Sequence, residues 1–363
     1  MTLVHADISR YGIHFTGVVM VRGLRVERRE GLLIVLKSDR SSAFGEIAPL
    51  PGLHDESLDE AGKALAEFIP ELPGLCRQTP GTRQRMLEEA QLPPSVATGI
   101  EMALFNLDAS ETGSFPSFPG TFPAAHMVPV NALLSGTPET VMNRARQRYA
   151  EGFRTFKLKV VRDRIDEAAA TIRAFHDAFG GRAGLRLDAN QSLGLDEAVE
   201  FGSAVPAGSV SYIEEPLTDA SMIPDFHDRT ALRSALDETL WQRPELLDEI
   251  PASALGGLIL KPNRIGGIMK SLDLALEAYR RSLPAVLSSA FESGVSLGMY
   301  ALMGAVCSPE PPACGLDTIS FLDHDLTGHP FASPEGKVDP AAAWRNSLRV
   351  RRELLEPVES WTW

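Results

Sequence analysis

The chain has 363 residues, of which 44% are hydrophobic and 23% are charged, and its formal net charge is −13. This is ordinary globular composition, enough for one large or two medium domains. An acidic balance with scattered basic residues argues against nucleic acid as a partner. The sequence contains no run of about 18 apolar residues, so it predicts no membrane span. The N-terminus lacks the charged-then-apolar order of a signal peptide.

The cysteine content also limits the possibilities. Cys76, Cys307 and Cys314 are too few, and odd in number, for a disulfide framework or a structural zinc site. They fit a reducing compartment, so we expect a cytoplasmic protein.

The first third of the chain predicts a separate domain of strands and helices. Residues 1–50 favour β-strands and end in a Pro/Gly turn, FGEIAPLPG. Residues 55–110 carry apolar residues at helical spacing. Residues 111–125 are rich in Pro, Gly and Ser, which is typical of a linker or domain-crossing loop. We therefore expect an N-terminal domain over residues 1–120.

From about residue 127 short apolar strands alternate with amphipathic helices, which predicts a parallel sheet. Seven or so units after residue 127 fit a compact TIM-type barrel, which we place over residues 121–322. An open doubly wound sheet is the alternative, although no G-x-G-x-x-G supports its dinucleotide-binding form. Residues 323–363 hold no further strand–helix unit, and we expect them to return to the N-terminal domain.

Polar residues stand at the ends of the predicted barrel strands. Alternate side chains of a strand share a face, so Lys157 and Lys159 of FKLKV lie together. Arg186, Asp188 and Asn190 of LRLDAN share a face in the same way.

Three further strands end in charged residues, namely SYIE in Glu214, SALD in Asp237 and GLILK in Lys261. By subtraction, the steps from Lys159 through Asp188 to these three residues are 29, 26, 23 and 24 residues. Each step is about one strand and one helix, so the side chains should meet at the C-terminal mouth of the barrel, where barrel enzymes keep their catalytic groups.

The charges of this set make chemical sense together. Three carboxylates converging without a cation would repel each other, and Mg²⁺ prefers such oxygen ligands. The flanking lysines can act as acid or base. We expect the ion and the neighbouring lysine to lower the pKa of each toward neutrality.

Each motif alone has a structural explanation. K-x-K is usually an exposed strand face, I-E-E-P a strand end entering a turn, and Asp237–Glu238 a helix cap. Five charged residues in register at the ends of otherwise apolar strands are difficult to explain in that way.

The order K-x-K, L-D-A-N, I-E-E-P, L-D-E-T and L-K-P-N resembles the muconate-lactonizing subgroup of the enolase superfamily. The resemblance runs from about residue 10 to residue 326. It implies an α+β capping domain and an α/β fold of the modified TIM type, a (β/α)₇β barrel. GEIAPLPGLHDES, LPPSVATGIEMAL and LSSAFESGVSLG resemble the dehydratases of this subgroup that serve menaquinone synthesis.

This resemblance implies a Mg²⁺-dependent lyase acting on a small carboxylate, a cyclohexadiene carboxylate that loses water by syn elimination through an enediolate. The metal ligands would be Asp188, Glu214 and Asp237. Lys159 would remove the α-proton and protonate the departing hydroxyl, with Lys157 in support, and Lys261 would stabilise the enediolate from the opposite face.

The substrate contacts implied by the resemblance are Ser288, Ser289, Ser293, Arg186 and Asn190. Gly294 stands where relatives often have a second serine. The three serines are equally typical of a strand-to-helix turn. The loop from Gly17 to Arg25 matches relatives loosely, so Arg22 and Arg25 either close over the substrate or face solvent.

Other functions stay open. An N-succinylamino acid racemase, a dipeptide epimerase or a cycloisomerase of the same subgroup would use the same lysines. SSAFES lacks the paired aspartates that would bind a substrate ammonium. A non-catalytic barrel protein would have lost some of the five site residues, and the Gly266–Gly267 pair is better explained as a turn than as a phosphate loop. The sequence leaves the oligomeric state open.

Overall fold

An antiparallel sheet forms the first unit of the structure, a computed structural model that describes residues 2–363. Its strand order is β13-β1-β2-β3. Arg22 and Gly23, with φ of 46° and 83°, form the two-residue turn between the two longest strands, as tight hairpins require. The strand bounds are β1 (Leu3–Val21), β2 (Leu24–Ser38), β3 (Ser42–Ile47) and β13 (Glu356–Thr362).

Four helices complete this unit, which we call the cap. The capping box of Ser57 and Glu60 starts the first of them. A Cβ on Gly45 would lie 1.9 Å from the carbonyl oxygen of Gly99, so glycine is needed where α4 crosses β3. The helices are α1 (Leu58–Phe68), α2 (Leu72–Cys76), α3 (Pro80–Glu89) and α4 (Pro94–Thr112). Within residues 2–363 no helix combines the length and apolar character needed to cross a bilayer.

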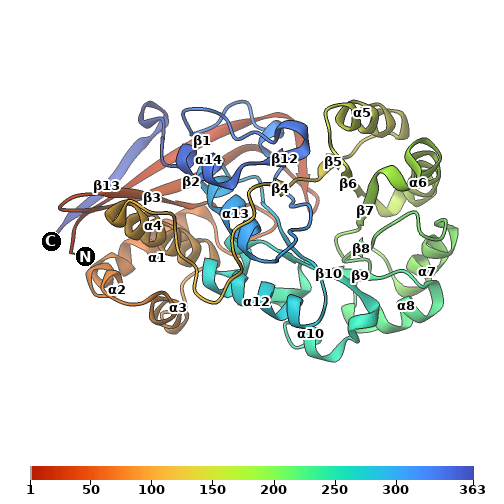
Figure 1. Cartoon of the computed structure of the whole chain (residues 1–363), viewed down its shortest axis with the longest axis horizontal. Coiled ribbons are helices and arrows are strands. Elements are labelled where there is room, and N and C mark those ends of the chain that lie inside the picture. The colour runs from red at the N-terminus through yellow and green to blue at the C-terminus, as the bar shows by residue number, and fades with distance from the viewer. Residues whose placement is uncertain (1) are drawn as a thin grey trace.

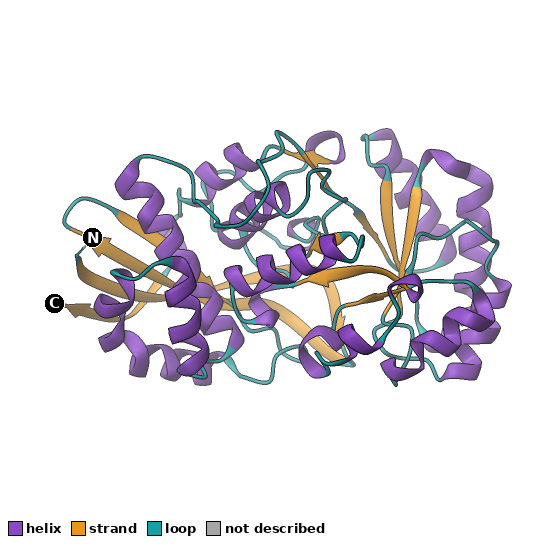
Figure 2. Ribbon diagram, turned by 60° about the horizontal axis from the view of Figure 1, so that its bottom comes forward, coloured by secondary structure: helices purple, strands orange, loops and turns teal. Residues whose placement is uncertain are grey.

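The second unit is a barrel of parallel strands in chain order, surrounded by helices (Figures 1 and 2). Its strands are β5 (Ala132–Leu134), β6 (Thr155–Lys159), β7 (Gly184–Asp188), β8 (Ile213–Glu214), β9 (Ser234–Leu236), β10 (Leu255–Leu260) and β11 (Ala285–Leu287). Parallel bridges join Cys314 to Val130 and Gly315 to Ser288, so this short segment closes the ring as an eighth strand. The predicted (β/α)₇β barrel with a capping domain is confirmed.

The helices that follow the barrel strands differ greatly in length, and the short ones keep the barrel compact. The long ones are α5 (Pro138–Ala150), α6 (Ile165–Phe179), α7 (Leu195–Ala204), α8 (Ile223–Thr230), α12 (Ile268–Arg280) and α13 (Gly294–Val306). The short ones are α9 (Thr239–Gln242), α10 (Leu246–Glu249) and α11 (Pro262–Ile265).

The C-terminal segment contacts both units. After the closing strand it forms β12 (Lys337–Val338), which pairs with β4 (Val128–Pro129), and α14 (Pro340–Ser347), which packs on α13. It then returns to the cap, where β13 pairs with β1. Both chain ends therefore lie at the outer edge of the cap (Figure 1).

Buried carboxylates of the cap hold the ends of barrel helices. Glu101 of α4 is 1% exposed, and its Oε2 accepts hydrogen bonds from the backbone nitrogens of Ile268 and Met269, at the start of α12. A negative charge is favourable at a helix N-terminus. Burial nevertheless raises the pKa of Glu101 from 4.5 to about 7, against the lowering effect of the two hydrogen bonds.

This raised pKa predicts a pH-dependent stability. Between pH 4.5 and about 7 the native state keeps the Glu101 proton that the unfolded chain releases, so the free energy of unfolding falls as pH rises. Glu101→Gln keeps an acceptor oxygen and removes this titration. Urea unfolding from pH 4 to pH 8 should show the wild type losing stability relative to the variant across this window. Parallel curves would contradict the prediction.

Candidate active site at the barrel mouth

Strand register brings the predicted charged residues to one end of the barrel. Lys159 is paired with Asp188 across β6 and β7, and Asp188 with Glu214 across β7 and β8. Asp237 follows directly after β9, and Lys261 directly after β10. Because the strands are parallel, their carboxyl ends meet at one mouth.

The alternation within β6 explains how lysines occupy a barrel strand. Phe156 and Leu158 are buried, 0% and 4% exposed, on the face that packs against helices. The ring of Phe156 contacts those of Phe175 and Phe179 of α6. Lys157 points the other way, into the barrel, where its side chain is 13% exposed.

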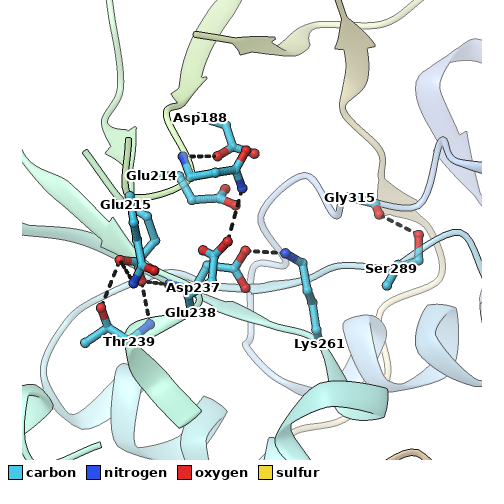
Figure 3. A network of polar contacts seen from close by, with 12 residues as sticks. Asp188, Glu214, Glu215, Asp237, Glu238, Thr239, Lys261, Ser289 and Gly315 are labelled. Atoms are coloured by element: carbon cyan, nitrogen blue, oxygen red, sulfur yellow. Dashed lines mark hydrogen bonds and ion pairs between the residues drawn. The ribbon is translucent and has the colours of Figure 1, made fainter. Parts of the chain in front are cut away.

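Ion pairs join the charges at the mouth. The Lys157 Nζ lies 2.8 Å from Asp188 Oδ2 and 2.7 Å from Glu214 Oε1. On the other side Lys261 is paired with Asp237, whose side chain is fully buried. Figure 3 shows Lys261 reaching Asp237 from one side, while Asp188 and Glu214 lie above it in this view.

The carboxylates raise the pKa of the lysines they touch. Burial by itself would lower the pKa of Lys157, but the charges of Asp188, Glu214 and Asp237 outweigh it and raise that pKa well above its usual value. The pKa of Lys261 is raised in the same way, chiefly by Asp237 against burial. The predicted lowering of these two pKa values depends on a bound cation and stays a prediction; in the absence of an ion the nearest charges are carboxylates, and they raise both values.

Among the three carboxylates that end adjacent strands, the pKa values of Asp188 and Asp237 are shifted in opposite directions. For Asp188, burial acts upward, but Lys157, Lys159 and Lys261 together lower its pKa to about 2. For Asp237, burial and the neighbouring Glu238 and Glu214 raise its pKa well above 3.8 despite Lys261. Burial and repulsion between carboxylates therefore raise the pKa of Asp237, whereas the three lysines dominate at Asp188.

The donor set fits a hard divalent cation. Three carboxylates end adjacent strands, and the buried Oδ1 of Asp237 has no hydrogen-bond partner, so one oxygen is free to accept a cation. Within residues 2–363 no three His, Cys, Asp or Glu side chains already have the spacing of an ion site. The Lys157 ammonium lies between Asp188 and Glu214 instead.

Lys159 differs from its neighbour on the same strand. It is exposed, and across residues 2–363 it forms no ion pair. Its charge still reaches Asp188, whose pKa it helps to lower. The structure thus supplies one lysine bound to carboxylates and one that is free, two residues apart on one strand.

A second row of polar groups, which the sequence analysis did not single out, supports the first. Glu215 accepts hydrogen bonds through Oε1 from the backbone nitrogens of Asp237, at 2.7 Å, and Thr239, at 2.8 Å. Its Oε2 accepts from the Thr239 hydroxyl at 2.8 Å (Figure 3). Burial, followed by the charge of Glu238, raises the pKa of Glu215 to about 7. Its position as the second acidic residue of I-E-E-P was the feature of the sequence that could have indicated Glu215.

The cap reaches this second row through the β1–β2 turn. Arg22 lies 3.3 Å from Glu238 Oε1 and donates to Gln191 Oε1 at 3.4 Å. The amide of Asn190 donates to the same Glu238 oxygen at 3.2 Å. Arg25, by contrast, is paired with the exposed Glu27 on the cap surface. Of the two arginines considered for this loop, only Arg22 contacts the mouth.

The remaining predicted substrate contacts divide into two groups. Arg186 lies beside Lys157 in register, and its Nη1 donates to Ala313 O at 2.6 Å and to Asn131 Oδ1 at 3.3 Å. Arg186 belongs to β7, which ends at Asp188. Asn190 lies two residues beyond that end, in a turn with φ of 43°, so it does not continue the strand face of Arg186 and Asp188 as predicted.

The three serines lie past β11, apart from the carboxylates. The Ser289 hydroxyl bonds the carbonyl of Gly315 and the hydroxyl of Thr318 (Figure 3). Ser288 is 7% exposed. Ser293 is fully buried as the N-cap of α13, where its hydroxyl accepts from Val295 N and donates to Glu46.

A separate cavity of about 670 Å³ is lined by Arg148 of α5, by residues between Leu316 and His324, and by residues 330–335. Buried Asp317, paired with Arg148, forms part of its wall. None of the lysines or carboxylates of the mouth lines it, so it is not part of the candidate site.

Two family models match the chain. One, described as the MenC N-terminal domain, matches residues 3–107, and the other, described as Enolase C-terminal domain-like, matches residues 140–343.

Curated relatives extend this similarity along most of the chain. The o-succinylbenzoate synthase of Haemophilus influenzae is 28% identical over 88% of this chain and 91% of its own length. That of Thermobifida fusca is 30% identical over 65% of this chain and 79% of its own. The protein PHYLLO of Arabidopsis thaliana is 31% identical over 90% of this chain, which spans only 22% of that longer protein.

Solved structures share the fold over nearly the full length. An enolase superfamily member from Roseovarius nubinhibens, complexed with magnesium, gives a TM-score of 0.80 at 18% identity and covers 99% of both chains. The L-Ala-D/L-Glu epimerase of Bacillus subtilis gives 0.81 at 20% identity, covering 93% of this chain and 96% of its own. At such identity the likeness concerns the fold.

The hydrogen bonds of Glu215 predict a graded loss of stability. Glu215→Ala leaves three buried donors without their acceptor and should lower the free energy of unfolding by roughly 3 kcal/mol. Thr239→Val removes only the hydroxyl donor and should cost about 1 kcal/mol. Urea unfolding of both variants measures the difference. Equal costs would show that Glu215 does not hold the turn that carries Asp237.

Proposed function

The chain belongs to the enolase superfamily, and on that premise we propose that it acts as an o-succinylbenzoate synthase. This lyase eliminates water from 2-succinyl-6-hydroxy-2,4-cyclohexadiene-1-carboxylate in menaquinone biosynthesis. Relatives of that name match most of the chain, and its first domain matches the MenC model. The observation that carries the proposal is the set of three buried carboxylates with lysines on strands to either side of it.

The proposed ligands of Mg²⁺ are Asp188, Glu214 and Asp237. Their oxygen donors, burial and adjacent strand positions support this assignment. When bound, the ion supplies positive charge next to the substrate carboxylate, which favours ionisation at the α-carbon. Burial raises the pKa of Asp237 despite Lys261, and a bound cation would offset this cost of burying its charge.

Lys159 is the proposed base. It takes the α-proton of the cyclohexadiene carboxylate, and the electron pair moves toward the carboxylate to give an enediolate. As the electrons return, the C–O bond to the ring hydroxyl breaks, and Lys159 gives its proton to the departing oxygen. The products are water and the aromatic ring. The absence of a carboxylate partner for Lys159 within residues 2–363 supports this role, because an ion pair would hold the proton.

Lys261 and Lys157 have electrostatic roles in this proposal. β10 stands four strands from β6 in a ring of eight, so Lys261 and Lys159 follow from opposite strands of the ring. The ammonium of Lys261, with a raised pKa, stays charged and stabilises the negative charge that develops on the substrate carboxylate. Lys157 fixes Asp188 and Glu214 relative to each other.

A 1,1-proton transfer is the second candidate function. Lysines on opposite sides of one α-carbon are what an N-succinylamino acid racemase would use, and structural neighbours include an N-succinyl Arg/Lys racemase. The relatives from Haemophilus influenzae and Aliivibrio salmonicida, which match 88% of the chain, carry the synthase name instead. Assaying dehydration and racemisation side by side decides between the two.

The first kinetic prediction separates the lysines. Lys159→Ala should reduce kcat by more than about 10⁴-fold, the upper range of general acid–base catalysis, because no other group on that face can act. Lys261→Ala should reduce kcat by about 10²–10³-fold through lost charge stabilisation.

Hydrogen exchange in D₂O on a slow substrate analogue distinguishes the two roles. Lys261→Arg keeps the positive charge and should retain α-hydrogen exchange, whereas Lys159→Arg should have none, because guanidinium does not give up its proton. Retained exchange in Lys159→Arg would reverse the assignment of the base.

The second prediction concerns the metal. Calorimetry should detect Mg²⁺ binding to the wild type, and EDTA should remove both the heat of binding and the activity. Asp237→Asn should weaken binding by at least about tenfold. Asp219→Asn removes the same charge at an exposed position outside the mouth and should not alter binding. Full activity in excess EDTA would reject the metal assignment.

A further inference from the structure

The segment that follows Lys261 is held from behind by the cap. The Thr98 hydroxyl of α4 donates to the carbonyl of Pro262 at 2.8 Å. The side chain of Asn263 donates to the carbonyl of Ala48 at 2.8 Å. The ring of His54 contacts the carbonyl of Asn263 at 3.1 Å. The backbone that carries a proposed active-site lysine is thus fixed by residues of the other domain.

His54 is the member of this set whose chemistry is most restricted. Its ring is 8% exposed, and burial, followed by the charge of Arg29, lowers its pKa to about 3. The ring is therefore neutral. The backbone nitrogen of Leu50 donates to Nδ1 at 3.0 Å, so the proton must be on Nε2. That proton is donated to the carbonyl of Asn263.

Asn263 also connects this region to the loop that follows the next barrel strand, β11. Its side-chain nitrogen donates to Glu292 Oε1 at 2.9 Å as well as to Ala48. Glu292 belongs to the loop after β11, and its Oε2 accepts from Ala290 N. Three segments therefore meet at Asn263, namely the turn after β3, the start of α11 and the loop after β11.

The position of Lys261 depends on this backbone. Lys261 is the residue immediately before α11, and its carbonyl accepts the first hydrogen bonds of that short helix, from Arg264 N and Ile265 N at 2.8 Å. A helix of four residues has little stability of its own. Hydrogen bonds from the cap to Pro262 and Asn263 stabilise this short helix from outside.

We propose that His54 is a positioning residue for Lys261, acting through the carbonyl of Asn263. The inference rests on the proposed role of Lys261. A displacement of about 1 Å in a catalytic group can cost about 10²-fold in rate. Loss of the His54–Asn263 hydrogen bond should therefore lower kcat, because the charge of Lys261 acts in the chemical step, and should change KM only weakly.

Two substitutions of His54 separate its two hydrogen bonds. An asparagine oxygen occupies nearly the place of Nδ1, so His54→Asn keeps the acceptor for Leu50 N and loses the donor to Asn263. A glutamine nitrogen reaches nearly the place of Nε2, so His54→Gln keeps the donor to Asn263. We expect His54→Asn to lower kcat by about 10- to 100-fold with KM within about threefold, and His54→Gln to restore kcat to within about threefold of the wild type.

Backbone hydrogen–deuterium exchange provides a readout that needs no substrate. The amides of Arg264, Ile265 and Gly266 are bonded to the carbonyls of Lys261 and Pro262. A peptide covering residues 262–269 should exchange faster in His54→Asn than in His54→Gln or the wild type. Equal kcat in the two variants, a change in KM alone, or unchanged exchange would overturn the proposal.

Thr98→Val tests the same constraint at a separate atom. It removes the hydroxyl bond to Pro262 with little change in volume, and it should lower kcat and speed exchange at residues 262–269 by less than His54→Asn does. If His54→Asn fails to fold, Thr98→Val and His54→Gln decide the matter, and a Thr98→Val enzyme unchanged in both readouts overturns the inference. A wild type that exchanges as expected but does not dehydrate the substrate rejects the proposed function instead.

Discussion

Burial of three carboxylates beside two ammonium groups at one mouth of a parallel barrel is the constraint on which the rest of the structure depends. Charges removed from water are tolerated only when they are paired and hydrogen-bonded. Lys157 between Asp188 and Glu214, and Lys261 on Asp237, satisfy this requirement. Such a cluster adds little to stability, so the apolar strand faces, such as Phe156 and Leu158 against α6, must supply it.

The cap donates and accepts hydrogen bonds that hold the barrel loops near the mouth. Glu46 of β3 accepts hydrogen bonds from Ser293 N, the Ser293 hydroxyl and Ser296 N, and so caps α13 after the loop that follows β11. Arg29 is fully buried and donates to the carbonyls of Phe291 and Pro49, one from each domain. The two domains therefore form one polar framework around the site, in which cap residues fix barrel loops that the barrel alone would leave free.

The sequence was most informative where chemistry and periodicity coincide. Lys159, Asp188, Glu214, Asp237 and Lys261 were predicted to meet because charged residues at regular spacing end otherwise apolar strands, and the structure places all five at one end of the barrel. It was least informative about electrostatics. Without a bound cation the pKa values of Lys157 and Lys261 are raised, because each lysine lies against a carboxylate at a distance that strand spacing does not specify. Glu215 was missed because its function is to accept backbone hydrogen bonds, which no side-chain pattern reveals.

By itself the sequence determined the strand–helix alternation, the order of charged strand ends and therefore the fold class and the chemical character of the site. These follow from local periodicity and from the fact that parallel strands all end on one side. Only the tertiary structure decided which partner each charge has, that Ser293 is a helix cap, and that His54, more than 200 residues before Lys261, contacts the loop behind it. Such contacts join segments remote in sequence, and their geometry is set by the packing of one domain on the other, which local pattern does not encode.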